Sequence, residues 1–323
     1  MINSFYSWDY LRTFYSAEHS QQFLRKCYET FSDADKLSYQ NSYAFIYYLE
    51  HGKKYFDQAE TAPYELQPVL LFYGMVQLMK AGILTVDPNY PETTQVLAHG
   101  VSTRKRKKSQ YSFLLDEVKV QKNGLLPHFS EKLFNLKQLE GEKYKMGALM
   151  QKVPELHKTF YYITNEKLAY EAQVSNEGII ISSKILDQLN ISKDAFVNFL
   201  NDHLKYKIVS CDEQKTTLLL KIDRKLTSLS SSPFQFNLSS GVYSLPTKRE
   251  LFSFFPELLA HYLLLYNLSM VCRYETEWWG ELFHSYPTND LPFITHFLKT
   301  TKHKVPYYIS LILKKQLNRG VSS

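Results

Sequence analysis

One long apolar segment near the carboxyl end of the chain constrains its fold most strongly. Residues 258–282 read LLAHYLLLYNLSMVCRYETEWWGEL, and their apolar side chains recur at the three- and four-residue offsets of an α-helix. Additional leucines fill the other faces of this helix, so its first half must be buried on every side. Such a helix belongs in the middle of a bundle, and we expect its polar second half to meet a different environment.

A second apolar segment supplies a partner for this helix. Residues 68–84, PVLLFYGMVQLMKAGIL, begin with a proline, which the first turn of a helix tolerates because that amide has no helical acceptor. Each segment is too apolar to stand alone, and we expect the two to pack together. Other helical patterns lie on both sides of the middle of the chain, at residues 8–31, 43–59, 291–298 and 306–317.

The hydrophobic period changes in the middle of the chain. Short β-like runs occupy residues 111–120, 178–182, 206–211 and 216–222, and one helix is expected at 192–204 with Ser192 as its N-cap. The pattern predicts an α+β fold: a mainly helical bundle formed by the N- and C-terminal segments, with a central β-containing insertion. The expected parts are residues 1–90, 91–243 and 244–323.

Composition favours a cytoplasmic protein. The three cysteines, Cys27, Cys211 and Cys272, are far apart and form no C-x-x-C pair, which argues against a disulfide framework. The N-terminus lacks a basic start followed by an apolar run, and the longest apolar stretches fall short of the ~20 residues that span a bilayer. We therefore expect no contact with a membrane.

The positive charge of the chain is concentrated in one place. The 38 basic and 32 acidic side chains give a formal net charge of +6, and five consecutive cations supply most of it: Arg104, Lys105, Arg106, Lys107 and Lys108. A block of this kind attracts phosphate groups or an acidic protein surface, or else forms a solvated loop. His99 and Gly100 come just before it, and a glycine there permits close approach of a ligand. These residues are predicted to bind an anionic partner.

The polar end of the opening helix provides a second group of candidates. Arg273 and Glu277 would share a helix face, which favours a salt-bridged helix end in which Arg273 has a structural role. Trp278 and Trp279 either complete the core or, if exposed, anchor a partner. The histidines have no metal-binding spacing, and nucleotide-binding loops and hydrolase signatures are missing from the sequence. We expect neither a metal nor a cofactor.

Three segments carry a family resemblance. They are YAFIYYLEHGKKYFDQAETAPYELQPVLLFYGMVQLMKA at residues 43–81, HGV at 99–101, and LSMVCRYETEWW at 268–279. The chain resembles the YaaC-like family of Bacillales over essentially its full length, and more loosely the helical proteins related to HEPN domains. The genes of family members often lie beside the gene for IMP dehydrogenase. The resemblance implies a protein partner in purine-nucleotide metabolism, with IMP dehydrogenase the first to consider.

The looser resemblance raises an enzymatic alternative. Arg12 and His19 lie seven residues apart in RTFYSAEH, and HEPN ribonucleases use an arginine and a histidine at similar spacing. Arginine can hold a phosphodiester while histidine transfers a proton. The pair lies in the first helix, however, whereas the HEPN motif comes late in its domain, and two solvated side chains would have the same spacing.

The expected function is therefore that of a non-enzymatic regulatory binding protein. Its basic run and aromatic surface would dock a partner such as IMP dehydrogenase. A HEPN-like ribonuclease or RNA-binding protein is the first alternative, and a purine-nucleotide sensor that binds its ligand in the β-rich insertion is the second. The sequence leaves the oligomeric state open.

Overall fold

The computed structural model describes residues 4–103, 111–137, 139–204, 206–229, 231–252 and 254–317. Two compact units divide the chain. The helical unit comprises Asn3–Ala148 and His261–Ser323, and the sheet unit comprises Leu149–Ala260. The chain passes from one unit to the other within helices α6 (Met146–Gln151) and α10 (Glu257–Tyr274). The helical unit is therefore assembled from both ends of the sequence.

The helical unit contains long helices and a small sheet. Its helices and strands outside α6 and α10 are α1 (Ser4–Arg12), α2 (Ala17–Cys27), α3 (Ala34–Thr61), α4 (Gln67–Leu84), η1 (Thr94–Leu97), β1 (Val101–Thr103), η2 (Phe113–Leu115), β2 (Glu117–Val120), α5 (Leu125–Phe134), β3 (Lys143–Lys145), α11 (Thr276–His284) and α12 (Asp290–Leu317). The three strands form an antiparallel sheet in the order β1-β2-β3.

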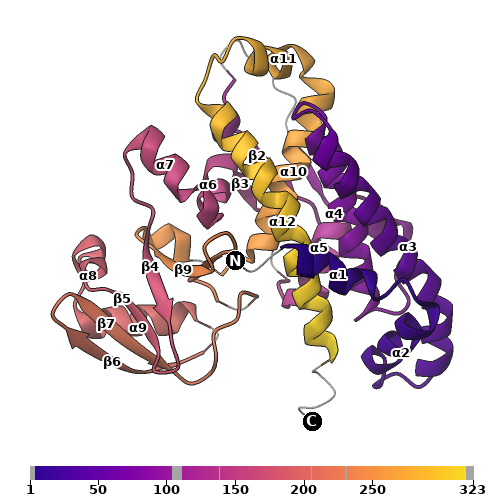
Figure 1. Cartoon of the computed structure of the whole chain (residues 1–323), viewed down its shortest axis with the longest axis horizontal. Coiled ribbons are helices and arrows are strands. Elements are labelled where there is room, and N and C mark those ends of the chain that lie inside the picture. The colour runs from indigo at the N-terminus through magenta and orange to yellow at the C-terminus, as the bar shows by residue number, and fades with distance from the viewer. Residues whose placement is uncertain are drawn as a thin grey trace. The chain divides into compact units, whose positions relative to one another are not determined.

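Helices α3 and α4 form an antiparallel pair along one side of the helical unit (Figure 1). Glycines bring their backbones close together: a Cβ at Gly52 would lie 2.7 Å from Leu78 Cδ2, and one at Gly74 would lie 2.8 Å from Phe56 Cδ2. Gly52 is thus a site of close packing inside a continuous helix, and Gly74 is a second one.

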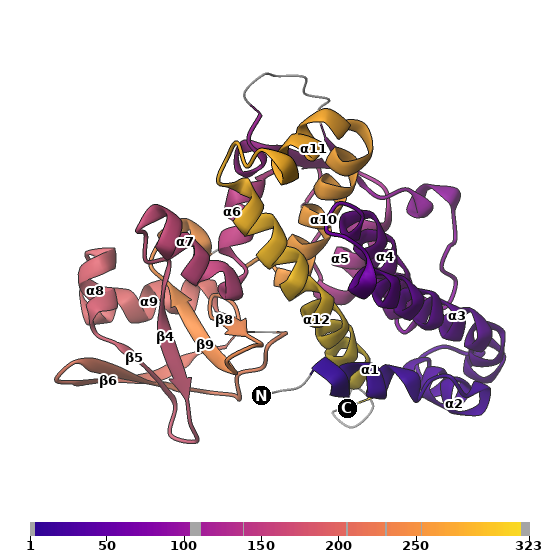
Figure 2. The same cartoon turned by 45° about the horizontal axis from the view of Figure 1, so that its top comes forward.

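The two ends of the chain meet in this unit. Helix α12 packs against α4 and against α1 and α2, and Figure 2 shows α1 beside the C-terminal part of α12. Helix α10 contacts α4 through Phe72, whose ring centroid lies 5.3 Å from that of Tyr262 and 5.6 Å from that of Tyr266. The predicted packing of the two apolar helices is confirmed.

The sheet unit has its own core. Its elements are η3 (Pro154–Leu156), α7 (His157–Thr164), β4 (Ala169–Val174), β5 (Ile179–Ser182), α8 (Lys184–Leu189), α9 (Lys193–His203), β6 (Ile208–Gln214), β7 (Thr217–Ile222), β8 (Gln235–Asn237), β9 (Val242–Pro246) and η4 (Arg249–Phe252). The six strands pair antiparallel in the order β6-β7-β5-β4-β9-β8. Ile181 and Leu218 from the sheet pack with Phe196 and Leu200 of α9.

The predicted α+β class is confirmed, with 58% helix and 14% strand. Ser192 caps α9 as expected, since its Oγ accepts a hydrogen bond from the Ala195 amide at 3.3 Å. The predicted limits of the three parts, at residues 90 and 243, stay a prediction. Compact packing assigns residues 91–148 to the helical unit.

Four expected helices have different limits in the structure. The helix expected at 8–31 is two helices, separated after Arg12, and the one expected at 258–282 is interrupted at Glu275. The two helices expected at 291–298 and 306–317 form one helix, α12, with Pro306 inside it. Proline removes one backbone hydrogen bond there. Buried neighbours such as Val305 and Tyr308 supply packing that offsets the loss.

Helix α4 is long and apolar enough to cross a membrane by length and composition alone. However, 72% of the residues in that 18-residue window are buried inside the structure, as in the core helix of a folded domain.

Candidate functional site

His99 lies in an aromatic environment made by two helices. Its ring centroid is 4.9 Å from that of Phe72 and 6.2 Å from that of Tyr73, both on α4. On the other side, Tyr266 of α10 lies 5.9 Å away. The apolar packing of α4 against α10 therefore positions the His99 imidazole between these two helices. They are the two segments that the sequence predicts to be most buried.

The backbone of His99 is held as firmly as its ring. Its carbonyl accepts a hydrogen bond from Tyr262 Oη at 2.9 Å and another from the Leu126 amide at 3.3 Å. The next residue, Gly100, has a φ of +76°, a conformation that glycine adopts without the steric cost of a side chain. A Cβ there would lie 2.5 Å from Pro127 Cδ. Gly100 thus permits close packing within the protein, where the sequence suggested close approach of a ligand.

Two cations act on His99. Burial lowers the pKa of the His99 imidazole, and the positive charges of Arg273 and Lys80 lower it further. Lys80 Nζ lies 5.6 Å from the ring centroid of Tyr48. Arg273 donates from Nε to the Ser269 carbonyl at 2.9 Å and from Nη2 to Met270 Sδ at 3.2 Å. Among the residues that the structure describes, neither cation forms an ion pair with a carboxylate.

We name these five residues the His99 cluster: Tyr73, Lys80, His99, Tyr266 and Arg273. Glu65, just before α4, accepts hydrogen bonds at its carbonyl from Cys272 Sγ at 3.1 Å and Trp279 Nε1 at 3.0 Å. The start of α4 is therefore close to the end of α10, so Arg273 lies toward the start of α4 and Lys80 toward its end. Seven residues separate Tyr73 from Lys80, about 10 Å along the helix. The two cations flank His99 and suit an anion with separated acidic groups.

Trp278 and Trp279 both contact other segments of the helical unit. Trp279 is buried, and its indole bonds to the Glu65 carbonyl. Trp278 is half-buried, donates to the Tyr111 carbonyl at 3.1 Å and meets the Tyr111 ring edge-on at 4.6 Å between centroids. Both side chains thereby tie α11 to distant segments of the same unit. Their role in partner binding stays a prediction.

Arg273 has a structural contact of the kind expected, though with a different partner. Its Nε bonds to a carbonyl of its own helix. The face expected to be shared with Glu277 is broken, because α10 ends at Tyr274 and Glu275 leaves the helical conformation before α11 begins. Burial raises the pKa of the neighbouring Cys272 thiol more than Arg273 lowers it, so this thiol stays protonated.

The basic run at Arg104, Lys105, Arg106, Lys107 and Lys108 lies outside the described residues. Strand β1 leads toward it along the chain, starting two residues after His99. The anion-binding role of the run stays a prediction.

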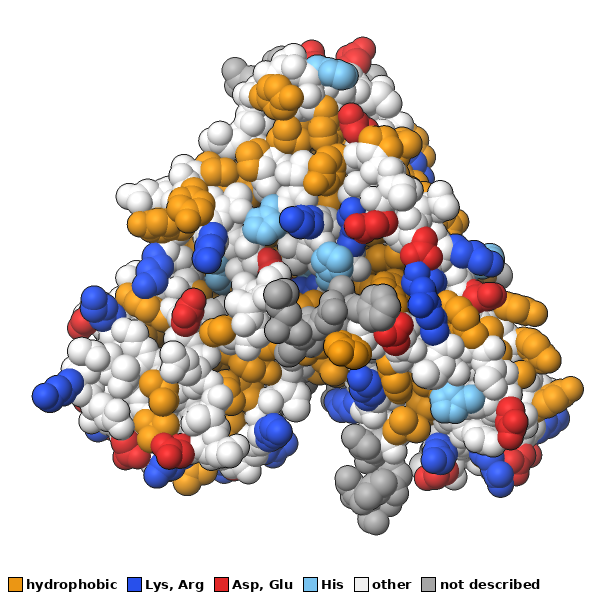
Figure 3. Space-filling model, viewed as in Figure 1, with side chains coloured by type: hydrophobic (Ala, Val, Ile, Leu, Met, Phe, Trp, Pro, Cys, Tyr) orange, Lys and Arg blue, Asp and Glu red, His pale blue; other side chains and the backbone are white. Residues whose placement is uncertain are grey.

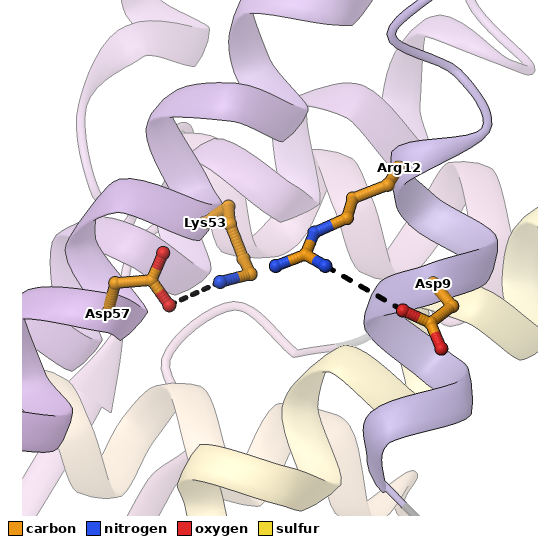
Figure 4. Close-up of polar contacts among 4 residues, drawn as sticks. All are labelled: Asp9, Arg12, Lys53 and Asp57. Carbon is orange, nitrogen blue, oxygen red and sulfur yellow. Dashed lines mark hydrogen bonds and ion pairs between the residues drawn. The ribbon is translucent and has the colours of Figure 1, made fainter.

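Arg12 and His19 do not share a helix. Arg12 ends α1, whereas His19 lies in the first turn of α2, where its ring stacks on Phe14 at 5.1 Å between centroids. Figure 4 shows the Arg12 guanidinium and the Lys53 ammonium of α3 directed toward each other, each paired with an aspartate. Arg12 Nη1 lies 3.7 Å from Asp9 Oδ1, and Lys53 pairs with Asp57. The expectation that Arg12 and His19 lie in one helix is therefore wrong.

Other histidines have structural partners. His261 is buried and its Nδ1 lies 2.7 Å from Thr301 Oγ1, so it is a hydrogen-bonded core residue. His128 Nε2 lies 2.9 Å from Asp87 Oδ2. This hydrogen bond and the nearby Lys132 keep the pKa of the Asp87 carboxyl below its ordinary value. Within the described ranges, no group of three or more potential metal ligands occurs.

Sequence reasoning selected His99 and Arg273 but missed Lys80, Tyr73 and Tyr266. The aromatic residues follow the helical core pattern, which conceals any second role. Lys80 carried a usable signal, because it is the one charged residue in the apolar segment 68–84.

Comparison with known proteins identifies one relationship. No curated protein and no solved structure is similar to the chain. The model of the YaaC-like protein family matches residues 12–313, which include all five members of the His99 cluster, most of the helical unit and the sheet unit. The chain therefore belongs to the YaaC-like family.

Proposed function

We propose that this protein is a non-enzymatic regulatory protein that docks an acidic segment of a protein partner. The observation that carries the proposal is the pair of partly buried cations, Lys80 and Arg273, which lack carboxylate counter-ions among the described residues. Charges removed from water are normally paired. An acidic partner would supply the missing negative charges from outside the chain.

The shape of the charge distribution favours a protein segment over a small single anion. Arg273 and Lys80 act on His99 from opposite directions along α4, so carboxylates on successive turns or residues of a partner fit better than one phosphate group. The half-buried side chain of Tyr73 offers a flat contact surface at the same place. The basic run at residues 104–108 adds sequence-adjacent positive charge that would steer an acidic partner toward the cluster.

IMP dehydrogenase is the first partner that we propose to test. Purified wild-type chain would be titrated with the enzyme at low and at high salt, with binding followed by calorimetry and the catalytic rate of the enzyme measured in parallel. We expect binding to weaken as salt rises, because exposed charges are screened. A change in the catalytic rate on binding would make the protein a regulator.

Charge-removing variants locate the docking site. Replacing Lys80 with Ser and Arg273 with Gln together should weaken binding about tenfold or more, because charge-assisted hydrogen bonds contribute more than neutral ones. Replacing residues 104–108 with Ser should mainly slow association. The matched control removes two exposed cations of the sheet unit, Lys158→Ser and Lys215→Ser, with no expected effect. No binding to IMP dehydrogenase would reject this partner, and equal affinity of all variants would reject the site.

A nucleotide could use the same cations, and the assay separates this possibility. Purine nucleotides would be added to the chain alone, and its thermal unfolding midpoint measured. Ligands that bind the folded state raise this midpoint as their concentration rises above the dissociation constant. A rise that disappears in the Lys80→Ser, Arg273→Gln variant would assign the cluster to a nucleotide instead of an acidic segment.

A further inference from the structure

A stripe of exposed tyrosines runs along α3. Tyr39, Tyr43 and Tyr47 have exposed fractions of 67%, 53% and 57%. Their four-residue spacing places them on one face of the helix, and the Tyr43 and Tyr47 rings lie 6.2 Å apart between centroids. Figure 3 shows hydrophobic side chains projecting from the edge of the molecule at which Figure 1 places α3. We call these three residues the tyrosine stripe.

The packing of α3 against the core of the helical unit fixes the direction in which the tyrosine stripe faces. The opposite face of α3 carries Phe45, Leu49 and Phe56, all buried in the helical unit. Helix α3 is continuous from Ala34 to Thr61, so the tyrosines cannot turn inward without removing these residues from the core. Three large amphipathic side chains in a row are unusual on a solvated helix and typical of contact surfaces.

Charges on both sides of the stripe are self-complementary. Lys36 and Glu50 lie seven residues before and after Tyr43, which is two helical turns and therefore almost the same face. When the helix is turned end over end about Tyr43, Lys36 and Glu50 exchange positions, so each meets a residue of opposite charge. Tyr39 exchanges with Tyr47.

We propose that a second copy of this chain packs on the tyrosine stripe, with the two α3 helices antiparallel about a two-fold axis at Tyr43. Lys36 then faces Glu50 of the partner subunit, and the symmetry repeats the pair on the other side. A shallow crossing angle of about 20°, as in helical bundles, keeps both pairs together. The tyrosines expose roughly 350 Å² per copy, less than the about 800 Å² of a stable interface. The dimer is therefore reversible.

Sedimentation equilibrium over a range of protein concentrations tests the dimer. We expect the wild type to change from monomer to dimer as concentration rises, and Tyr43→Ser to stay monomeric. The matched control is Tyr162→Ser, because Tyr162 is exposed on α7 of the sheet unit and should leave the dimer unchanged. Circular dichroism and the unfolding midpoint establish that each variant is folded.

Charge exchange tests the two-fold axis. Lys36→Glu alone places like charges opposite each other twice and should raise the dissociation constant about tenfold or more. Glu50→Lys alone should do the same, and the variant with both changes should return to the wild-type value. A wild type that stays monomeric, a dimer that survives Tyr43→Ser, or a double variant as weak as the single ones would overturn the proposal. Loss of IMP dehydrogenase binding by Tyr43→Ser, with a monomeric wild type, would assign the stripe to that partner instead.

Discussion

At the scale of single residues, two glycines make the His99 cluster possible. Gly100 and Gly124 face each other so closely that a Cβ on Gly124 would lie 2.3 Å from the nitrogen and Cα of Gly100. Both have positive φ angles, +76° and +133°. The Leu125 amide then bonds to the Ala98 carbonyl at 2.7 Å. Any side chain at this contact would separate the segment that carries His99 from the start of α5.

The variant Gly124→Ala should therefore be strongly destabilised. Its conformation alone costs about 1–3 kcal/mol, and the overlap with Gly100 adds a further cost from displaced backbone. Gly141→Ala is the matched control, because Gly141 also has a positive φ of +81° but open space around it. Urea unfolding should show a larger loss of stability for Gly124→Ala than for Gly141→Ala. Equal losses would mean that the contact with Gly100 contributes nothing.

The protonation of His99 should make stability depend on pH. Its pKa in the folded state lies below the ordinary value of 6.5, chiefly because it is buried. The unfolded state therefore binds the proton at higher pH, and the folded state loses stability as pH falls below about 6.5, by at most about 1.4 kcal/mol per pH unit. In His99→Gln this part of the slope should vanish. The difference in unfolding free energy between wild type and variant, measured from pH 7.5 to 5.0, checks it; a constant difference would contradict the prediction.

At the scale of elements, the helices followed from their hydrophobic period but their interruptions did not. The break after Arg12 is stabilised by Ser16, whose Oγ accepts a hydrogen bond from the His19 amide at 3.3 Å. The break at Glu275 has no proline or glycine beside it. Four residues after this break, the Trp279 indole donates a hydrogen bond to the Glu65 carbonyl. Tertiary contacts of this kind leave no signal in the local spacing of apolar residues, which is why the sequence did not place these interruptions.

The shorter elements show the same limit. The runs at 178–182 and 216–222 contain consecutive Ile and Leu residues and became β5 and β7, in the middle of the six-stranded sheet. Strand β4 lies beside β5, yet only Ala172 of its sequence AYEAQV is buried, and the sequence gives no strand pattern. Strand β4 forms because its backbone pairs with β5 and β9.

Asp290 joins the start of α12 to a distant loop. Its carboxylate is buried and accepts hydrogen bonds from the amides of Phe113 and Leu114 at 3.0 and 3.2 Å. It also accepts from the hydroxyls of Ser112 and Thr288. The side chain thereby satisfies backbone donors of η2 that would otherwise be buried without acceptors.

Asp290→Ala should therefore cost roughly 3–5 kcal/mol in unfolding free energy, because buried donors lose a charged acceptor. Asp290→Asn keeps one oxygen acceptor and should cost less. The control is Asp33→Ala: Asp33 precedes α3 but makes no side-chain capping bond, so its loss should cost under about 0.5 kcal/mol. Chemical denaturation of the three variants provides the measurement. Similar costs for Asp290→Ala and Asp33→Ala would show that the buried network is unimportant.

At the scale of the whole molecule, the sequence predicted that both ends of the chain form one helical body. The reason is physical: segments 68–84 and 258–282 each have more apolar surface than one neighbour along the chain can cover. The grouping of residues 91–148 with that body was not predicted. Strands β1, β2 and β3 are only three or four residues long, and they resemble the β-rich middle of the chain in pattern while belonging to the helical unit.

At the same scale, the positions of Arg12 and His19 bear on the nuclease alternative. Cleavage of RNA by an arginine and a histidine requires both groups at one phosphodiester. Here Arg12 pairs with Asp9 at the end of α1, and His19 stacks on Phe14 in α2. We expect purified protein to leave labelled cellular RNA intact, and Arg12→Ala and His19→Ala to behave as the wild type does. Gel analysis of the RNA after prolonged incubation gives the answer. Cleavage by the wild type that disappears in His19→Ala would restore the ribonuclease and displace the docking proposal.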